Sequence, residues 1–361
     1  MTGNVFNYYA SGNTAKGFYN LFENNLVDLN NLFILEGGLS TGKSILMKII
    51  GSQWIDKGND IEYLHCLTDN DLIDGVINID LKIGIVDSTA THIIEPTAPG
   101  AIREYVNLSV AWDSSKLKPY TNAILDLETK ISNCYKTAYE YFGKALKIHD
   151  EWEKIYIENM NFEKADRLTE EVIYLLLKDN RLEKHSKVKH RFLGAATPKG
   201  PVDFVENLTS TVSKRYFIKG RPGTGKSTFL KKLQKISQDR GYDVEVYHCG
   251  FDPNSLDMII LRELDVCIFD STAPHEHFPS RENDEIIDLY KELITPGTDE
   301  KYKNEIYDIS MRYKIAVSKG TLYLKQAKEL HDQLEKLYGN ATDFNKIDEM
   351  TEELILTISK C

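Results

Sequence analysis

The most regular pattern in the chain is an apolar seam whose positions are spaced alternately by four and three residues. The seam is sustained for five repeats over 120–155 and is repeated over 302–337. Heptad spacing of this kind predicts a long helix with one apolar stripe. At ~1.5 Å per residue, the helix over 120–155 would be about 54 Å long. The aromatic residues on the seam are interpreted as core packing.

A second helix is expected after each seam, near 162–178 and near 343–359. The short turns "ENMN" and "GNAT" separate each long helix from its successor. Each pair is therefore predicted to fold back on itself as an antiparallel helical hairpin. The hairpins would hold two units face to face, carry a partner protein or act as a lid, and the sequence leaves these roles open.

Short apolar runs elsewhere predict buried strands. "IGIVD" at 83–87 and "VCIFD" at 266–270 each end in an aspartate. Two further runs precede glycine-rich stretches that lead into amphipathic helical patterns, and "DIEYLHCLTD" and "DVEVYHCGFD" look like the strands that follow those helices. Strands that alternate with helices predict an α/β fold, here with a mainly parallel sheet flanked by helices in each unit.

These elements occur twice because the chain contains an internal repeat. Gly37 and Gly220 begin matching segments 183 residues apart, and 23 of the 60 aligned positions from 37 to 96 are identical. Self-similarity of this extent predicts two tandem units. The predicted units are 1–183, with a core over 1–118 and a hairpin over 119–180, and 184–361, with a core over 190–300 and a hairpin over 301–360. A basic linker is expected near 181–192.

Composition restricts the class of protein. The chain has 361 residues, of which 42% are apolar and 27% charged, so two soluble globular domains are expected. The formal charge of −11 argues against nonspecific binding to nucleic acid or anionic lipid. A leader peptide and a bilayer-spanning run are both missing from the pattern, which predicts a cytoplasmic protein without membrane contact. Five scattered cysteines without a C-x-x-C pair indicate reduced thiols.

The strongest chemical signal is a Gly-x-x-x-x-Gly-Lys-Ser loop, present once in each unit. We refer to residues 37–44 as the first loop and to 220–227 as the second loop. Glycines let backbone N–H groups curl around phosphate oxygens, and the helix that follows adds its positive N-terminus. Lys43 and Lys226 are expected to reach the phosphates. The residues predicted to bind the nucleotide are Gly37, Thr41, Gly42, Lys43, Ser44 and Ile45, and Gly220, Pro222, Gly223, Thr224, Gly225, Lys226, Ser227 and Thr228.

The aspartates that end the two apolar runs complete this pattern. Asp87 and Asp270 each follow the loop lysine by about 44 residues, where a buried strand would deliver a carboxylate to the Mg²⁺ side of a nucleotide. Predicted Mg²⁺ ligands are Ser44 and Asp87, and Ser227 and Asp270. With these Walker A and Walker B segments the chain resembles the P-loop nucleoside triphosphatase superfamily. More narrowly, it is similar to tandem P-loop ATPase-like proteins of bacteria that carry a D-[GS]-T-A-P-H phrase. The resemblance implies ATP and Mg²⁺ as cofactors.

The predicted catalytic residues of the second unit are Lys226, Asp252, Asp270 and His275. Many P-loop ATPases place a glutamate after the Walker B aspartate, but Ser271 and Ser88 stand there. Asp252, just past a strand end, is the first choice for general base, with a helix N-cap as the alternative. His275, like His92, would contact the γ-phosphate or only fix its loop. His248 and His65 are assigned to packing or to an indirect contact with the site, and Thr272 and Thr89 to a phosphate contact or a turn.

Three function classes are compatible with these residues. An ATPase or nucleotide-driven switch is favoured, a small-molecule or nucleotide kinase is the alternative, and a silent nucleotide-binding scaffold is third. Kinases usually close an Arg-rich lid, and only Arg221 and Arg281 lie near the motifs. Arg281 is read as an arginine finger or as the partner of Glu282 or Asp284. Ser40 replaces a glycine of the second loop, so the second site is expected to be the more active one.

Overall fold

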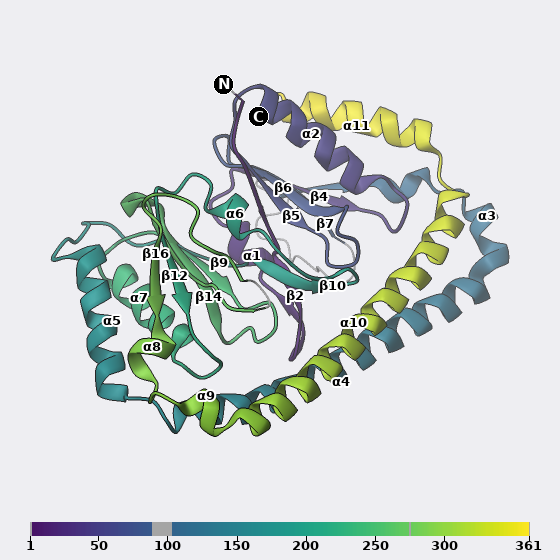
Figure 1. Ribbon diagram of the computed structural model, residues 1–361. Coiled ribbons are helices and arrows are strands. Elements are labelled where there is room, and N and C mark those ends of the chain that lie inside the picture. The colour runs from purple at the N-terminus through teal and green to yellow at the C-terminus, as the bar shows by residue number, and fades with distance from the viewer. Residues whose placement is uncertain (1, 89–102, 274–275, 361) are drawn as a thin grey trace.

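The computed structural model describes residues 2–88, 103–273 and 276–360, and it is a mixed α/β structure with two sheets and two very long helices (Figure 1). Each sheet forms a head together with the helices packed on it. The long helices α4 (Thr121–Ile157) and α10 (Lys303–Gly339) run side by side beneath both heads, and we call them the arms. The N- and C-termini lie close to each other at the first head.

The two six-stranded sheets have corresponding strand orders. The first sheet has the order β1-β5-β6-β7-β4-β8 and the second β9-β13-β14-β15-β12-β16, when both are read from the same edge. The strands of the first sheet are β1 (Val5–Tyr8), β4 (Asn31–Glu36), β5 (Ile61–His65), β6 (Ile73–Asn78), β7 (Ile83–Asp87) and β8 (Arg103–Asn107). Those of the second are β9 (Val188–Phe192), β12 (Lys214–Lys219), β13 (Val244–His248), β14 (Leu256–Leu261), β15 (Val266–Asp270) and β16 (Glu285–Asp288).

Each sheet is mainly parallel, as predicted, but it is mixed because one strand runs antiparallel to the rest. β6 and β14 are antiparallel to both of their neighbours, whereas the other pairings in each sheet are parallel. The cause is the short connection from β5 to β6 and from β13 to β14, because a tight turn can only return antiparallel. The strand that ends in each aspartate lies beside the strand that leads into each loop: Leu35 pairs with Asp87, and Ile218 with Asp270.

The larger helices α2 and α11, and α7 and α5, cover the outer faces of the two sheets, whereas the short helices α1 and α6 lie between the heads. The bounds are α1 (Phe22–Asn25), α2 (Lys43–Asp56), α3 (Ser114–Leu117), α4 (Thr121–Ile157), α5 (Phe162–Leu177), α6 (Val205–Leu208), α7 (Lys226–Asp239), α8 (Leu289–Leu293), α9 (Thr298–Lys301), α10 (Lys303–Gly339) and α11 (Phe344–Ile358). Two small hairpins complete the heads, β2 (Ser11–Thr14) with β3 (Gly17–Asn20), and β10 (Gly194–Thr197) with β11 (Gly200–Asp203).

The two heads share one hydrophobic core. A single cluster joins apolar side chains of both sheets, among them Ile34 of β4 and Phe217 of β12. Tyr9 and Phe192 exchange two backbone hydrogen bonds of 3.0 Å at the junction. A sheet whose inner face is covered by the other half does not have a complete core of its own. The heads are therefore interdependent.

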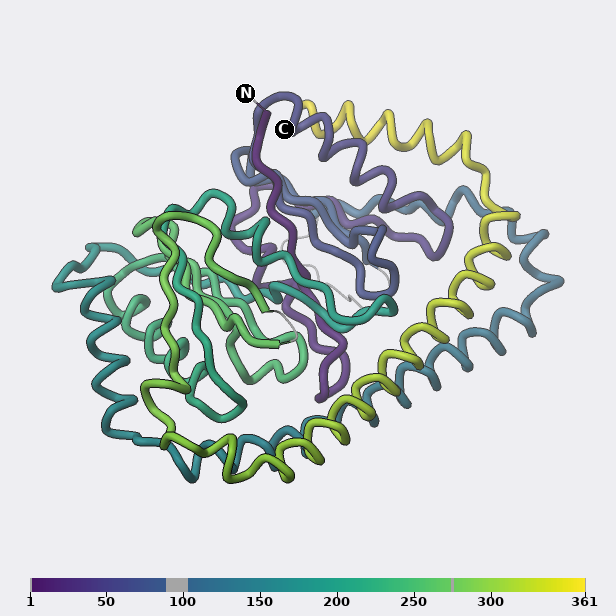
Figure 2. Tube along the Cα trace, viewed as in Figure 1, coloured from purple at the N-terminus to yellow at the C-terminus, as the bar shows by residue number. Residues whose placement is uncertain are grey.

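The arms cross from one head to the other, and the predicted hairpin pairing is wrong. α4 packs along α10, while α5 continues onto the second head, where Val172 and Leu177 join the core beside α7 (Figures 1 and 2). In the same way α11 packs on the first head through Ile347 and Leu354. The apolar seams of α4 and α10 therefore pack against each other, because the apolar faces of α5 and α11 are already buried against the helices that cover the sheets.

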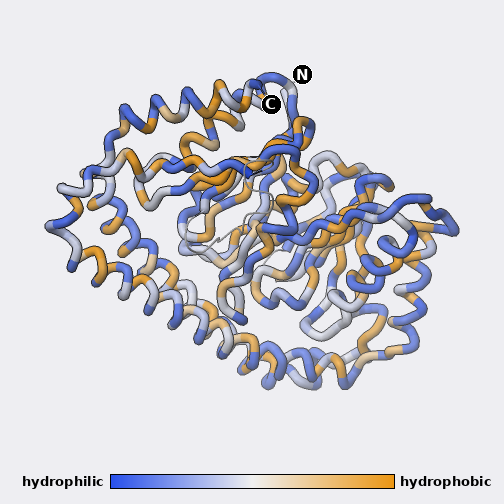
Figure 3. Tube along the Cα trace, turned by 180° about the vertical axis from the view of Figure 1, so that it is seen from behind, coloured by the Kyte–Doolittle hydropathy of each residue, from blue (hydrophilic) through white to orange (hydrophobic). Residues whose placement is uncertain are grey.

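The hydropathy pattern follows this arrangement. Hydrophobic positions recur along both arms and gather in the strands (Figure 3). Residues 188–192 of the predicted linker form β9, whose backbone pairs with β13, so only the segment before it is a connection. Among the described residues no helix has both the length and the apolar character required to cross a bilayer.

Candidate functional site

Both loops connect the end of a strand with the first turn of a helix. The first loop follows β4 and opens α2, and the second follows β12 and opens α7. Gly42 and Gly225 occupy the N-cap positions with φ of 69° and 86°. Gly223 has φ of 75°, and its counterpart Ser40 has φ of 59°. Ser40 thus carries a side chain where glycine is preferred, as the sequence indicated.

Each loop lysine is paired with the aspartate of the neighbouring strand. The Lys43 Nζ atom lies 2.7 Å from an Asp87 carboxylate oxygen, and that of Lys226 lies 3.6 Å from Asp270. Both ammonium groups also donate to loop carbonyls, Lys43 to Gly37 and Lys226 to Arg221. The pair in the first head is the tighter and more buried of the two.

The hydroxyl residues of the loops divide into two kinds. Ser44 and Ser227 each accept a hydrogen bond of 2.9 Å from a backbone N–H of the antiparallel strand, β6 or β14. A hydroxyl oxygen that accepts one bond keeps a second lone pair, so it can still coordinate a cation. Thr41 and Thr224 are buried and donate to carbonyls within their own loops. These two threonines therefore shape the loops.

The remaining predicted nucleotide-binding positions have different environments. Ile45 is exposed in the first turn of α2, and Thr228 is exposed in the first turn of α7. Pro222 is half-buried beside the exposed Arg221. Gly220 is closely packed, since a Cβ atom there would meet the Thr224 side chain. The close approach of the backbone at Gly220 to Thr224 is therefore possible only without a side chain at position 220.

Asp252 lies in the turn between β13 and β14. Its carboxylate accepts from the backbone N–H of Asn254 at 3.2 Å and from the Ser255 hydroxyl at 3.3 Å, and Lys16 lies 3.4 Å away. The alternative of a helix N-cap is wrong, because the following segment is the strand β14. Its counterpart Asp69 forms an ion pair of 3.0 Å with Lys328 of the arm α10.

The predicted histidines have different outcomes. His275, His92 and Thr89 lie outside the described residues. His248 contacts the His190 ring nitrogen at 2.9 Å and the Pro253 carbonyl oxygen at 2.6 Å, which agrees with a packing role. Burial lowers the pKa of His248, so the neutral ring is favoured in the fold.

The turn after β15 is closed by Thr272. Both its hydroxyl and its backbone N–H donate to one carboxylate oxygen of Asp270, at 2.6 and 3.1 Å. Thr272 therefore closes the turn, which is one of the two roles that the sequence predicted for it. The second carboxylate oxygen of Asp270 is the one that faces Lys226.

The arginines near the motifs are held by protein groups. Arg221 forms an ion pair of 3.0 Å with Asp299 and stacks over the Tyr290 ring. The Arg281 guanidinium donates to the carbonyl oxygens of Thr209 and Val212 at 3.0 Å each. The predicted side-chain partners Glu282 and Asp284 are therefore wrong. Asp284 instead accepts from the backbone N–H of Arg281.

Sequence analysis missed a set of arm residues that reaches the loops. His149, Asp150 and Glu153 of α4 have ligand-type atoms within 4.8 Å of one another, and among described residues this group has a spacing suited to a metal ion. They lie against the second loop, because a Cβ on Gly223 would come within 2.5 Å of the Glu153 carbonyl oxygen. The signal was the repeated phrase "HDEWE" and "HDQLE".

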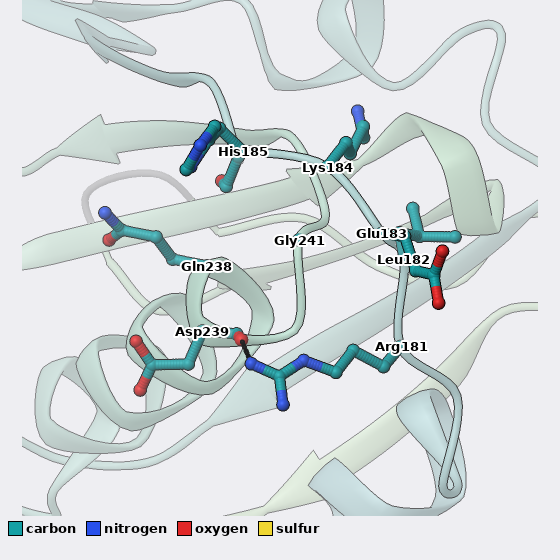
Figure 4. Close-up of a pocket in the computed structure, with 9 residues that line it drawn as sticks. Arg181, Leu182, Glu183, Lys184, His185, Gln238, Asp239 and Gly241 are labelled. Atoms are coloured by element: carbon teal, nitrogen blue, oxygen red, sulfur yellow. Dashed lines mark hydrogen bonds between the residues drawn. The ribbon is translucent and has the colours of Figure 1, made fainter.

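Comparison with protein-family models, with curated proteins and with solved structures finds no match to this chain. A surface hollow of about 580 Å³ lies apart from the loops, between residues 181–186 and the end of α7 (Figure 4). There Arg181 donates to the Asp239 carbonyl oxygen at 3.1 Å. Its lining contains none of the predicted site residues.

Proposed function

We propose that the chain is a Mg²⁺-dependent ATPase or ATP-driven switch with two internal nucleotide sites, built from two copies of a P-loop unit. The observation that carries the proposal is the repeated arrangement of loop, lysine and aspartate. In both heads a glycine-rich loop opens a helix at a left-handed glycine, and its lysine faces the aspartate of the adjacent parallel strand.

This arrangement suits a polyphosphate. The helix N-terminus and the loop N–H groups attract anions, and the lysine supplies a full positive charge. Ser227 and Asp270 offer the hard oxygen ligands that Mg²⁺ prefers, and Ser44 and Asp87 do so in the first head. Bound Mg²⁺ would neutralise charge that develops on the phosphates.

The second site is proposed as the more active one. Lys226 lies farther from its aspartate than Lys43, and its side chain is slightly more exposed. Lys226 would therefore lose a weaker ion pair than Lys43 when its side chain turns toward a phosphate. Gly223 also adopts its left-handed conformation without a side chain, unlike Ser40.

Steady-state hydrolysis of Mg-ATP tests the proposal. Lys226→Ala is expected to lower phosphate release by more than tenfold, and Lys43→Ala by less, since the lysine stabilises transferring phosphoryl charge. Lys235→Ala is the matched control, because Lys235 is exposed on the same helix α7. Equal losses from both loop variants would refute the asymmetry, and no ATP binding by calorimetry would refute the function.

Adding nucleosides and nucleotides to the same assay tests the kinase alternative. ADP formation that requires an acceptor would favour a kinase over an ATPase. Arg221 and Arg281 are both held by protein partners, which supports hydrolysis. Tight binding without turnover would favour the scaffold.

A further inference from the structure

The end of each arm lies against the loop that belongs to the other half of the sequence. Glu153 of α4 contacts the second loop: its main chain packs on Gly223, and its carboxyl lies near the Gly223 N–H and within electrostatic reach of Lys226. Glu335 of α10 contacts the first loop, where its carbonyl oxygen accepts the Ser40 hydroxyl at 2.7 Å. The two glutamates occupy equivalent places in the repeated phrase.

The charged groups around Glu153 include Lys226 of the second site. Burial and Asp150 raise the pKa of Glu153, and Lys226 and the Gly223 N–H oppose them. His149, whose Nδ1 lies 3.5 Å from a Glu153 oxygen, is within electrostatic reach of Lys226. At the other end of the arm pair, burial and Asp332 raise the pKa of Glu335.

The contact with Gly223 indicates where the Glu153 carboxylate stands relative to a nucleotide. An N–H at the apex of such a loop is a donor that phosphate oxygens use. A carboxylate near this N–H would therefore lie near the phosphates of a nucleotide bound to the loop, and the two negative groups would repel each other. The repulsion would keep the carboxylate apart from the phosphate, at a separation that a water molecule could bridge.

We propose that Glu153 is the general base of the second site, supplied from the first half of the chain. The inference rests on the proposed function. It also provides the carboxylate that is missing after Asp270, where Ser271 stands.

The proposed step is hydrolysis of the β–γ phosphoanhydride bond. The oxygen of a water molecule attacks the γ-phosphorus, and a proton of that water passes to the Glu153 carboxylate. The bond from the γ-phosphorus to the bridging oxygen breaks, and its electron pair leaves with ADP. The proton is then released from Glu153 to phosphate or solvent. General-base assistance of this kind typically contributes 10²–10⁴-fold to the rate.

The first experiment compares Glu153→Gln with the wild type in Mg-ATP hydrolysis and in equilibrium ATP binding. We expect kcat to fall by about 10²-fold or more, as expected for loss of a general base, with the Kd for ATP changed by less than about threefold. Glu151→Gln is the matched control, because Glu151 is on the same helix and pairs with Arg312. Unchanged hydrolysis, or faster hydrolysis with tighter binding, would overturn the proposal, the latter by showing that Glu153 only blocks the loop.

The second experiment tests which site Glu153 serves. In a Lys226→Ala background, Glu153→Gln should cause little further loss, because both changes disable the second site. In a Lys43→Ala background it should remove most of the remaining activity. The opposite pattern would place Glu153 at the first site and refute the exchange. If the wild type binds no ATP, the proposed function fails; if hydrolysis depends on Lys226 and not on Glu153, only this inference fails.

Discussion

Replacing Arg191 by methionine tests how strongly the two heads depend on the ion pair buried between them. Arg191 of β9 is 1% exposed and donates to Glu62 of β5, which is 4% exposed. It also donates to Asn25 at 2.9 Å and lies 4.2 Å above the Tyr8 ring. Methionine fills much of the volume but leaves the Glu62 charge without its main partner. Breaking a buried pair in this way costs about 3–5 kcal/mol.

The cost should depend on pH. Burial alone would raise the pKa of Glu62, but Arg191 and the Tyr8 hydroxyl help to hold it below its ordinary value. In the wild type the pair therefore stabilises the fold above the unfolded pKa, and this contribution is lost as pH falls through the folded pKa. Without Arg191, burial dominates and the folded pKa rises. The folded variant then binds a proton more readily than the unfolded chain, so its deficit shrinks on acidification.

Urea denaturation followed by circular dichroism at pH 8 and pH 5 measures both effects. We expect a large deficit for Arg191→Met at pH 8 and a smaller one at pH 5. Glu62→Gln in the same chain should recover part of the loss at pH 8, because it removes the unpaired charge. Arg181→Met is the control, since Arg181 is exposed. A deficit below about 1 kcal/mol, the range of exposed pairs, or one that is equal at both pH values would refute this reasoning.

Two further predictions concern the arms and the junction. Phe142→Ala should lower the free energy of unfolding by about 3–5 kcal/mol in thermal or urea unfolding, because the buried Phe142 ring fills the space over Gly320. Phe162→Ala is the control, since Phe162 is exposed. Equal losses of stability in the two variants would contradict the role of Phe142 in packing the arms. Burial lowers the pKa of His65 to about 4, so the unfolded chain binds its proton first and stability should fall by up to about 3 kcal/mol as pH drops from ~6.5 to 4. His65→Gln should flatten that part of the stability–pH curve and the exposed His185→Gln should not; a curve unchanged by His65→Gln would refute this assignment.

Local sequence patterns were sufficient to predict the strands and helices around the two loops. The apolar runs that end at Asp87 and Asp270 are the strands β7 and β15, and the helical patterns after the loops are α2 and α7. These features depend on neighbours in sequence, such as strand periodicity and glycine at left-handed positions. The left-handed conformation of Gly223 follows from the same local chemistry, whereas Ser40 adopts that conformation in spite of its side chain.

Contacts between segments far apart in the sequence could not be predicted from local patterns. A heptad seam shows that a helix has an apolar stripe, but it does not name the helix that covers the stripe. Short turns favour a return onto the preceding helix, yet α5 buries Val172 and Leu177 against the second head. The contact between Glu153 and the second loop was missed for this reason, since the two lie about 70 residues apart in different predicted units.

The exchange of arms places each loop between the start of one arm and the end of the other. In the first head, Gly38 lies against Trp112, which precedes α4, and Trp112 in turn packs on Tyr338 near the end of α10. In the second head, Asp299, which precedes α10, binds the loop residue Arg221 and also Tyr156 at the end of α4.

A rearrangement at either loop would therefore act on both arms. The arms are packed against each other at their centre, where Tyr141 and Tyr323 stack and Ala138, Phe142 and Leu324 are buried together. Close packing transmits displacement because it has few voids to absorb it. Coupling between the two proposed sites would then need no contact between the loops themselves. It requires only that the arms move as a pair, and Phe142→Ala, which loosens their central contact, is the variant in which the two sites should act most independently.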